Sequence, residues 1–103
     1  MSKEKAKKIV KQYIEVLKKE NFPLTAVYLY GSHAKGNPHF GSDIDVAIIS
    51  PRLRKNWNKT EAWLWKARRN VNSLIEPVGY APENFIDADP LVTEIKTTGI
   101  RIV

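Results

Sequence analysis

Two aspartates at the start of an apolar stretch have the spacing in this sequence that most directly suggests chemistry. Asp43 and Asp45 are two residues apart, and the apolar run 46–49 follows them. Residues two apart in a β-strand project from the same face, so the two carboxylates would lie side by side. The two negative charges would repel each other, and such a pair is usually neutralised by a cation or a proton. Because Mg²⁺ prefers oxygen ligands, the pair is a candidate metal site. A solvent-exposed pair at a strand opening is the alternative.

A candidate phosphate-binding turn precedes the aspartates. Gly31-Ser32 follows the apolar segment 24–30 directly. Gly31 allows a ligand to approach the main chain closely, and Ser32 offers an N–H and a hydroxyl to phosphate oxygens. A helical turn over 33–35 would add its positive end, and Lys35 would add a point charge. On its own, a Gly-Ser pair is equally typical of a turn that ends a strand.

Hydrophobic periodicity predicts the sheet that must hold these residues. Apolar residues at helical spacing predict a helix over 2–20, and a segment apolar on both faces predicts a central strand over 24–30. The remaining expected elements are a strand over 43–50, a loop over 51–58, a helix over 59–71, a strand over 73–79 placed near a sheet edge by Pro77, a short helix over 90–97 and a last strand over 100–103. This order predicts an α/β (α+β) fold, with one small mixed β-sheet packed against helices, as a single domain over 1–103.

Composition narrows the classes of protein and partner. The chain has a formal net charge of +6 and a pI near 9.7, which favours an anionic partner such as a nucleotide, a nucleic acid or an acidic protein surface. Surplus surface lysine would give the same balance. The absence of cysteine excludes disulfides and thiolate metal sites. With no apolar run of the ~20 residues that a membrane helix needs and no secretory signal, we expect a cytoplasmic protein without a membrane partner.

The order of the two candidate motifs is more specific than either motif alone. An apolar strand leads into Gly31-Ser32, ten residues (33–42) follow, and Ser42-Asp43-Ile44-Asp45 opens a second apolar strand. In this order the sequence resembles the nucleotidyltransferase superfamily related to DNA polymerase beta. It is most similar to the smallest members, the minimal nucleotidyltransferases of bacteria and archaea. The resemblance covers roughly residues 5–80 and is sharpest over 27–49.

The resemblance implies a role for each motif residue. Gly31 and Ser32 would hold a nucleoside triphosphate, and Asp43 and Asp45 would bind Mg²⁺. A third carboxylate on the next strand would complete the metal site and help to deprotonate the attacking hydroxyl.

The third carboxylate and two further nucleotide-binding residues are assigned by position. Glu76 is the only carboxylate in the expected third strand; aspartate is more usual there, and Pro77 after it is a departure. Lys35 stands where family members often carry arginine. Ser42 resembles the small residues that shape the family's loop.

The implied reaction is transfer of a nucleoside monophosphate, AMP from ATP, to an acceptor hydroxyl, with two Mg²⁺ ions and release of pyrophosphate. Minimal nucleotidyltransferases are often encoded beside a small helical HEPN-family protein. The pair can act as a toxin–antitoxin system in which the transferase modifies the toxin, so the resemblance implies such a partner. Two alternatives stay open: a catalytically silent module that neutralises its partner by contact, and a basic nucleic-acid-binding domain. A homo-oligomer also stays open, and the transferase hypothesis does not require nucleic acid.

A basic segment and several ring residues have weaker claims. Residues 52–69 contain seven basic residues and one acidic residue, Glu61. They would either flank the active site or form a solvated helix face. Trp63 is expected in the core, whereas Trp65 would be an interface anchor or a cover for the helix edge. His33 and His39 are expected to be loop histidines without a special role.

Overall fold

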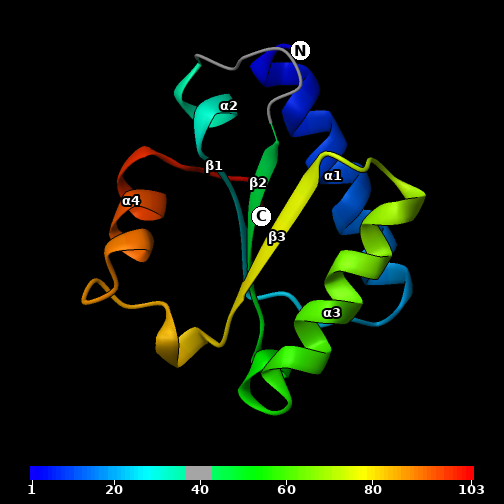
Figure 1. Ribbon diagram of the computed structural model, residues 1–103, viewed down its shortest axis with the longest axis vertical. Helices are drawn as coiled ribbons and strands as arrows, with labels where there is room; N and C mark the ends of the chain where they lie inside the picture. The colour runs from blue at the N-terminus through cyan, green and yellow to red at the C-terminus, as the bar shows by residue number, and fades with distance from the viewer. Residues whose placement is uncertain (37–42) are drawn as a thin grey trace.

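The structure, a computed structural model, describes residues 1–36 and 43–103. Helices lie on both sides of a four-stranded sheet (Figure 1). The elements follow in the order α1 (Lys3–Lys19), β1 (Ala26–Tyr30), α2 (Ser32–Lys35), β2 (Ile44–Ile49), α3 (Trp57–Ala67), β3 (Ile75–Tyr80), α4 (Pro90–Thr98) and β4 (Ile100–Arg101). Short 3₁₀ turns cover Pro51–Arg54, Arg68–Asn70 and Pro82–Asn84.

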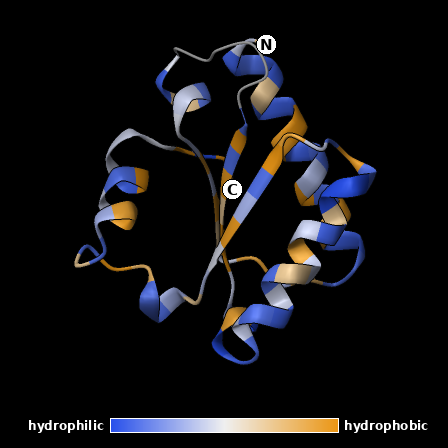
Figure 2. Ribbon diagram, viewed as in Figure 1, coloured by the Kyte–Doolittle hydropathy of each residue, from blue (hydrophilic) through white to orange (hydrophobic). Residues whose placement is uncertain are grey.

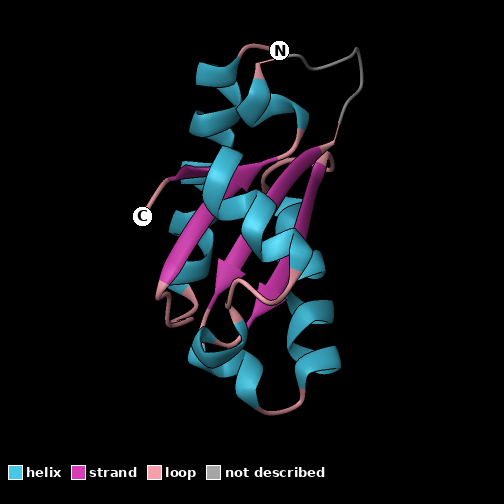
Figure 3. Cartoon of the chain, turned by 90° about the vertical axis from the view of Figure 1, so that its left-hand side faces the viewer, coloured by secondary structure: helices cyan, strands magenta, loops and turns pink. Residues whose placement is uncertain are grey.

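The sheet is mixed, with strand order β3-β2-β1-β4. β1 pairs antiparallel with β2 and with β4, and β2 pairs parallel with β3. Two parallel strands cannot be joined by a tight turn, and α3 supplies the crossover between them. Seen from the α4 side, the strands are rotated relative to one another (Figure 3), as the steric twist of β-strands requires.

β3 is an edge strand, as Pro77 predicts. Its outer edge is closed by α3, because the Gly79 N–H donates to Glu61 Oε2 at 3.0 Å and the Trp57 indole N–H donates to the Gly79 carbonyl at 3.0 Å. Backbone groups two residues apart face the same side of a strand, so the nitrogen of Pro77 also faces away from β2. A residue without an N–H therefore removes no bond from the β2–β3 ladder.

The larger core lies between the sheet and the two long helices α1 and α3. α1 buries the apolar stripe that its sequence spacing predicts, and Ser2 caps its first turn through the Lys5 N–H. Even-numbered residues of β2 and odd-numbered residues of β1 face this layer, where they are buried. Figure 2 shows the hydrophobic sides of these helices turned toward the sheet. The buried Tyr13 hydroxyl joins the two helices by donating to the Leu64 carbonyl at 2.7 Å.

The opposite face of the sheet carries a smaller apolar cluster covered by α4. Ala26, Ala47, Ile49 and Ile95 are buried in it, and partly buried aromatic residues surround them. Strand alternation places the odd-numbered residues of β2 and the even-numbered residues of β1 and β3 on this face. The smaller layer is therefore the one that receives the carboxylates.

The predicted fold class is confirmed, and the predicted elements are all present with shifted bounds. The expected loop 51–58 contains a 3₁₀ turn and the first residues of α3, which begins after Asn56 adopts a left-handed backbone (φ 51°). The expected helix to residue 71 instead tightens into a 3₁₀ turn from Arg68 onward. Within the described residues, no helix combines the length and the apolar character needed to cross a membrane.

The hydrogen bond between α1 and α3 can be tested by removing one oxygen atom. Burial raises the pKa of Tyr13, so its hydroxyl stays a protonated donor. We expect Tyr13→Phe to lower the free energy of unfolding by about 1 kcal/mol, the typical net contribution of a buried hydrogen bond. Urea denaturation measures the change. An unchanged midpoint would mean that this bond does not stabilise the packing of α1 against α3.

Candidate nucleotide and metal site

The three predicted carboxylates lie together at one end of the sheet. Asp45 on β2 is the register partner of Glu76 on β3 and of Tyr30 on β1, so these three residues form one row across the strands. Asp43 directly precedes β2, and its charge is among those that act on Glu76. The structure thus brings Glu76 to the two aspartates although it stands 31 positions after Asp45 in the sequence.

The turn after β1 packs its backbone directly against this cluster. Gly31 has φ 76° and ψ −154°, a conformation essentially restricted to glycine. A Cβ atom placed on Gly31 would lie 2.2 Å from Asp45 Oδ2, which is far inside van der Waals contact. Ser32 begins α2 immediately afterwards, and Gly36 ends it with a left-handed backbone. The Gly31-Ser32 turn and the Asp45 carboxylate therefore lie in direct contact.

Electrostatics in the cluster favour proton or cation uptake. Partial burial raises the pKa of Asp45, and the neighbouring Asp43 carboxylate raises it further. Burial also raises the pKa of Glu76, with the charges of both aspartates acting in the same direction. The Arg68 charge opposes this rise. Negative charges held together against their repulsion create a site that a cation stabilises.

Three further groups act on the cluster and were not predicted from the sequence. Glu94 on α4 raises the pKa of Asp45 by its charge, whereas His33 lowers it. Tyr30, between β2 and α4, has its pKa raised by burial first and by Asp45 second. Tyr30 was recognisable as the residue before the Gly-Ser turn, but no local signal marks Glu94, because only the tertiary fold brings α4 to this face.

The remaining predicted site residues have different outcomes. The Lys35 ammonium forms an ion pair with Glu94 at 3.5 Å. Ser42 lies outside the described residues, as does His39. His33 differs from the loop histidine expected, since it belongs to α2 and is 1% exposed.

The donor set fits a hard cation that is shared with a nucleotide. Within residues 1–36 and 43–103, no three His, Asp or Glu side chains form a complete metal-binding group. Mg²⁺ does not need one, because it typically binds one or two carboxylates together with phosphate oxygens and water. The all-oxygen donors, their mutual repulsion and the partly exposed glycine backbone beside them agree with this mode of binding.

The structure separates most of the basic segment 52–69 from the carboxylates. α3 packs in the layer with α1, on the other face of the sheet. Arg54 is held by Glu83 through two hydrogen bonds of 2.6 and 2.9 Å, and Arg52 lies over the Phe22 ring. Arg68 differs, since its charge reaches Glu76 and its guanidinium lies over the ring of the exposed Trp65 at 4.8 Å. Trp63 packs against the core as predicted, whereas both alternatives for Trp65 stay predictions.

The fold and the carboxylate row define a class of protein that transfers nucleotidyl groups, and comparison with known proteins supports this class. The family model described as polymerase beta, nucleotidyltransferase matches residues 5–102. This chain therefore belongs to the polymerase beta nucleotidyltransferase family. No curated protein matches the sequence significantly.

Solved structures share the fold at low sequence identity. A mutant form of the toxin–antitoxin MntA–HpeT has a TM-score of 0.67 and 21% identity, over 90% of this chain and 71% of that one. A toxin–antitoxin structure with AMP-PNP has a TM-score of 0.65 and 24% identity, over 94% and 72% of the two chains. A candidate nucleotidyltransferase from Sulfolobus solfataricus has a TM-score of 0.65 and 16% identity, over 96% and 80%.

The contact between Gly31 and Asp45 can be separated from the cost of the glycine backbone. Gly36 has a similar φ of 79° but no atom within 4 Å of an added Cβ. We expect Gly36→Ala to destabilise the fold by about 1 kcal/mol through backbone strain alone. Gly31→Ala should cost at least about 1 kcal/mol more, because its backbone is less accessible to alanine and Asp45 must also move. Equal costs in urea denaturation would contradict the proposed contact.

The raised pKa of Asp45 predicts a pH-dependent effect of neutralising it. A carboxyl group whose pKa is higher in the folded than in the unfolded state destabilises the fold when charged, and the penalty vanishes as pH falls below the unfolded value near 3.8. In metal-free buffer, Asp45→Asn should therefore stabilise the protein at pH 7 and lose this advantage at pH 3.5.

Denaturation at both pH values measures this effect, with Asp87→Asn as the control. Asp87 is exposed and pairs with Lys96 at the surface, so its neutralisation should change stability little. An Asp45→Asn variant less stable than the native protein at pH 7 would contradict the electrostatic argument.

Proposed function

We propose that this protein is a Mg²⁺-dependent transferase that moves a nucleoside monophosphate, AMP from ATP, to a hydroxyl group on a partner protein. The observation that carries the proposal is the contact between the glycine-restricted turn at Gly31 and the carboxylate row of Asp45 and Glu76. A triphosphate bound along the Gly31-Ser32 backbone would place its oxygens beside Asp43 and Asp45. This is the arrangement that a cation shared between phosphate and carboxylates requires.

Each side chain of the site then has a distinct task. Asp43 and Asp45 would hold Mg²⁺, which neutralises charge on the phosphates when it is bound. Glu76 would complete the metal site and take the proton of the attacking hydroxyl. The Ser32 hydroxyl and N–H would donate to the triphosphate.

Lys35 would exchange one anionic partner for another. Its ion pair with Glu94 is about half exposed at both ends, and such pairs contribute little stability. A triphosphate carries more negative charge than one carboxylate, so the Lys35 ammonium can turn to the phosphates at small cost.

The similar structures support the choice of nucleotide and of acceptor. One of them is a toxin–antitoxin with AMP-PNP, an analogue of ATP. Another is MntA–HpeT in a variant that replaces two aspartates, two residues apart, by glutamates. The same spacing separates Asp43 from Asp45. By this likeness we propose a small helical toxin of the HEPN type as partner and acceptor, with this chain as the antitoxin.

A catalytically silent module that only covers its partner is the second candidate. A binding surface alone does not need a positive-φ backbone at Gly31 where any Cβ would clash with Asp45. Nor does it need a row of carboxylates that repel one another. Both features cost stability in the free protein. Their presence therefore favours the transferase.

The proposal predicts Mg²⁺-dependent binding of ATP by the isolated chain. In calorimetric titrations, ATP should bind with Mg²⁺ present, and at least tenfold more weakly in an Asp43→Asn/Asp45→Asn variant, because both carboxylates that share the cation are gone. GTP, CTP and UTP are titrated alongside to determine the donor preference.

Asp87→Asn provides the matched control, since it removes an aspartate far from the row and should leave ATP binding unchanged. ATP binding that is independent of Mg²⁺, or that survives in the double variant, would contradict the proposed site. If ATP binds as expected, transfer of α-phosphate label from ATP to the partner separates the transferase from the silent module.

A further inference from the structure

A basic hollow lies at the end of the molecule opposite the carboxylates. It has a volume of about 500 Å³ and lies between the 3₁₀ turn Pro51–Arg54 and the first half of α3. We call it the basic groove and define it by Arg52, Lys55, Asn56, Lys59, Thr60 and Trp63. Among the described residues that line it, none is acidic. The groove therefore attracts anions.

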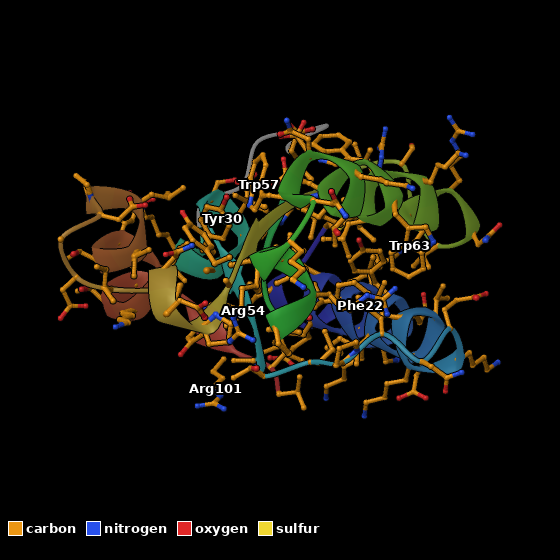
Figure 4. The ribbon with its side chains drawn as sticks, turned by 90° about the horizontal axis from the view of Figure 1, so that it is seen from below. Phe22, Tyr30, Arg54, Trp57, Trp63 and Arg101 are labelled. Carbon is orange, nitrogen blue, oxygen red and sulfur yellow. The ribbon has the colours of Figure 1, made fainter. Side chains whose placement is uncertain are left out.

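An aromatic side chain, Trp63, forms one wall of the basic groove, and the buried Phe22 ring stacks against it. Phe22 and Trp63 lie with ring centroids 5.2 Å apart and an angle of 14° between the ring planes. The Arg52 guanidinium covers the Phe22 ring at 5.5 Å, which fixes a cation at the rim of the groove. Figure 4, the view from below, shows Phe22, which follows α1, close to Trp63 from α3.

A second hollow shares Trp63 with the basic groove. This hollow has a volume of about 290 Å³, and Lys66, Asn70 and Glu20 are among its lining residues. Trp63 lines both hollows, so an aromatic side chain stands between two sites that each carry lysine. From Lys59 to Lys66 the helix rises about 10 Å.

The basic groove is separate from the proposed catalytic site. β2 (Ile44–Ile49) carries the chain from Asp45 toward Ser50, which precedes the groove. Five residues of extended chain span about 17 Å. The groove also opens in the α1–α3 layer, whereas the carboxylates lie on the α4 face. A nucleotide bound at Gly31 cannot reach the groove. The positive charges of the groove would therefore serve another ligand.

We propose that the basic groove binds single-stranded nucleic acid. Lysines on both sides of an aromatic side chain match the phosphates and the bases of such a strand, and this combination characterises single-strand binding surfaces. An acidic peptide would use the cations but not the aromatic wall. Arg54, the side chain in this region best suited to bind a carboxylate, is already bound to Glu83 by two hydrogen bonds. The site is additional to the transferase site and does not depend on it.

The proposal is tested with the whole chain and a labelled 12-mer of oligouridylate in fluorescence anisotropy, without nucleotide or Mg²⁺. We expect binding that weakens as salt rises from 50 to 200 mM. Lys55→Gln/Lys59→Gln should weaken binding about tenfold at 50 mM salt and reduce the salt dependence, because two phosphate contacts are lost. Both lysines are exposed, so the variant should fold and still bind Mg²⁺–ATP as the native protein does.

Lys5→Gln/Lys8→Gln is the matched control, because it removes the same charge from the exposed side of α1 near the other end of the molecule. It should change the affinity less than twofold. An abasic 12-mer tests the aromatic wall and should bind at least fivefold more weakly than oligouridylate. Equal losses in the two lysine variants, or equal binding of the abasic strand, would overturn the proposal. So would preferential binding of poly-glutamate, which would make the groove a surface for an acidic protein.

Discussion

The contact between the Asp45 carboxylate and the Gly31 backbone is the constraint on which the site depends. It requires a residue without a Cβ at the end of β1, and it requires β1 and β2 to be neighbours, so that Tyr30 and Asp45 stand opposite each other. The parallel pairing of β2 with β3 then places Glu76 on the other side of Asp45. One close approach of backbone to carboxylate thus joins the turn that would hold phosphates to the row that would hold a cation.

The unequal layers of the fold explain how such a site is tolerated. The α1–α3 layer buries most of the apolar side chains, and the α4 layer buries a smaller cluster. Hydrophobic burial in the larger layer offsets the strain at Gly31 and the repulsion among the carboxylates. The site is built on strand ends, which hold side chains more rigidly than loops do. The α4 face also contributes Glu94, which forms an ion pair with Lys35. The Lys35 ammonium is the group that the phosphates would need.

The sequence predicted the parts of the fold and the site that local patterns encode. The stripe from Ala6 to Leu17 predicted α1, and the alternation after Asp43 predicted β2 with both aspartates on one face. Pro77 predicted an edge strand, which holds because its nitrogen faces outward. Positions that depend on tertiary contact were missed. Glu94 reaches the row only through the packing of α4, His33 becomes buried only when α2 closes onto the core, and the basic residues 52–55 fall at the far end because β2 is long enough to carry them there.

The central claim is that the Gly31-Ser32 turn and the carboxylate row together bind one metal–nucleotide complex. A crystal structure of the chain with Mn²⁺, a spectroscopic and anomalous-scattering substitute for Mg²⁺, and a non-hydrolysable ATP analogue tests it most directly. The account predicts an anomalous peak in contact with Asp43 and Asp45, with the triphosphate along the Gly31-Ser32 backbone. A triphosphate in the basic groove, or a metal peak away from both aspartates, would contradict it.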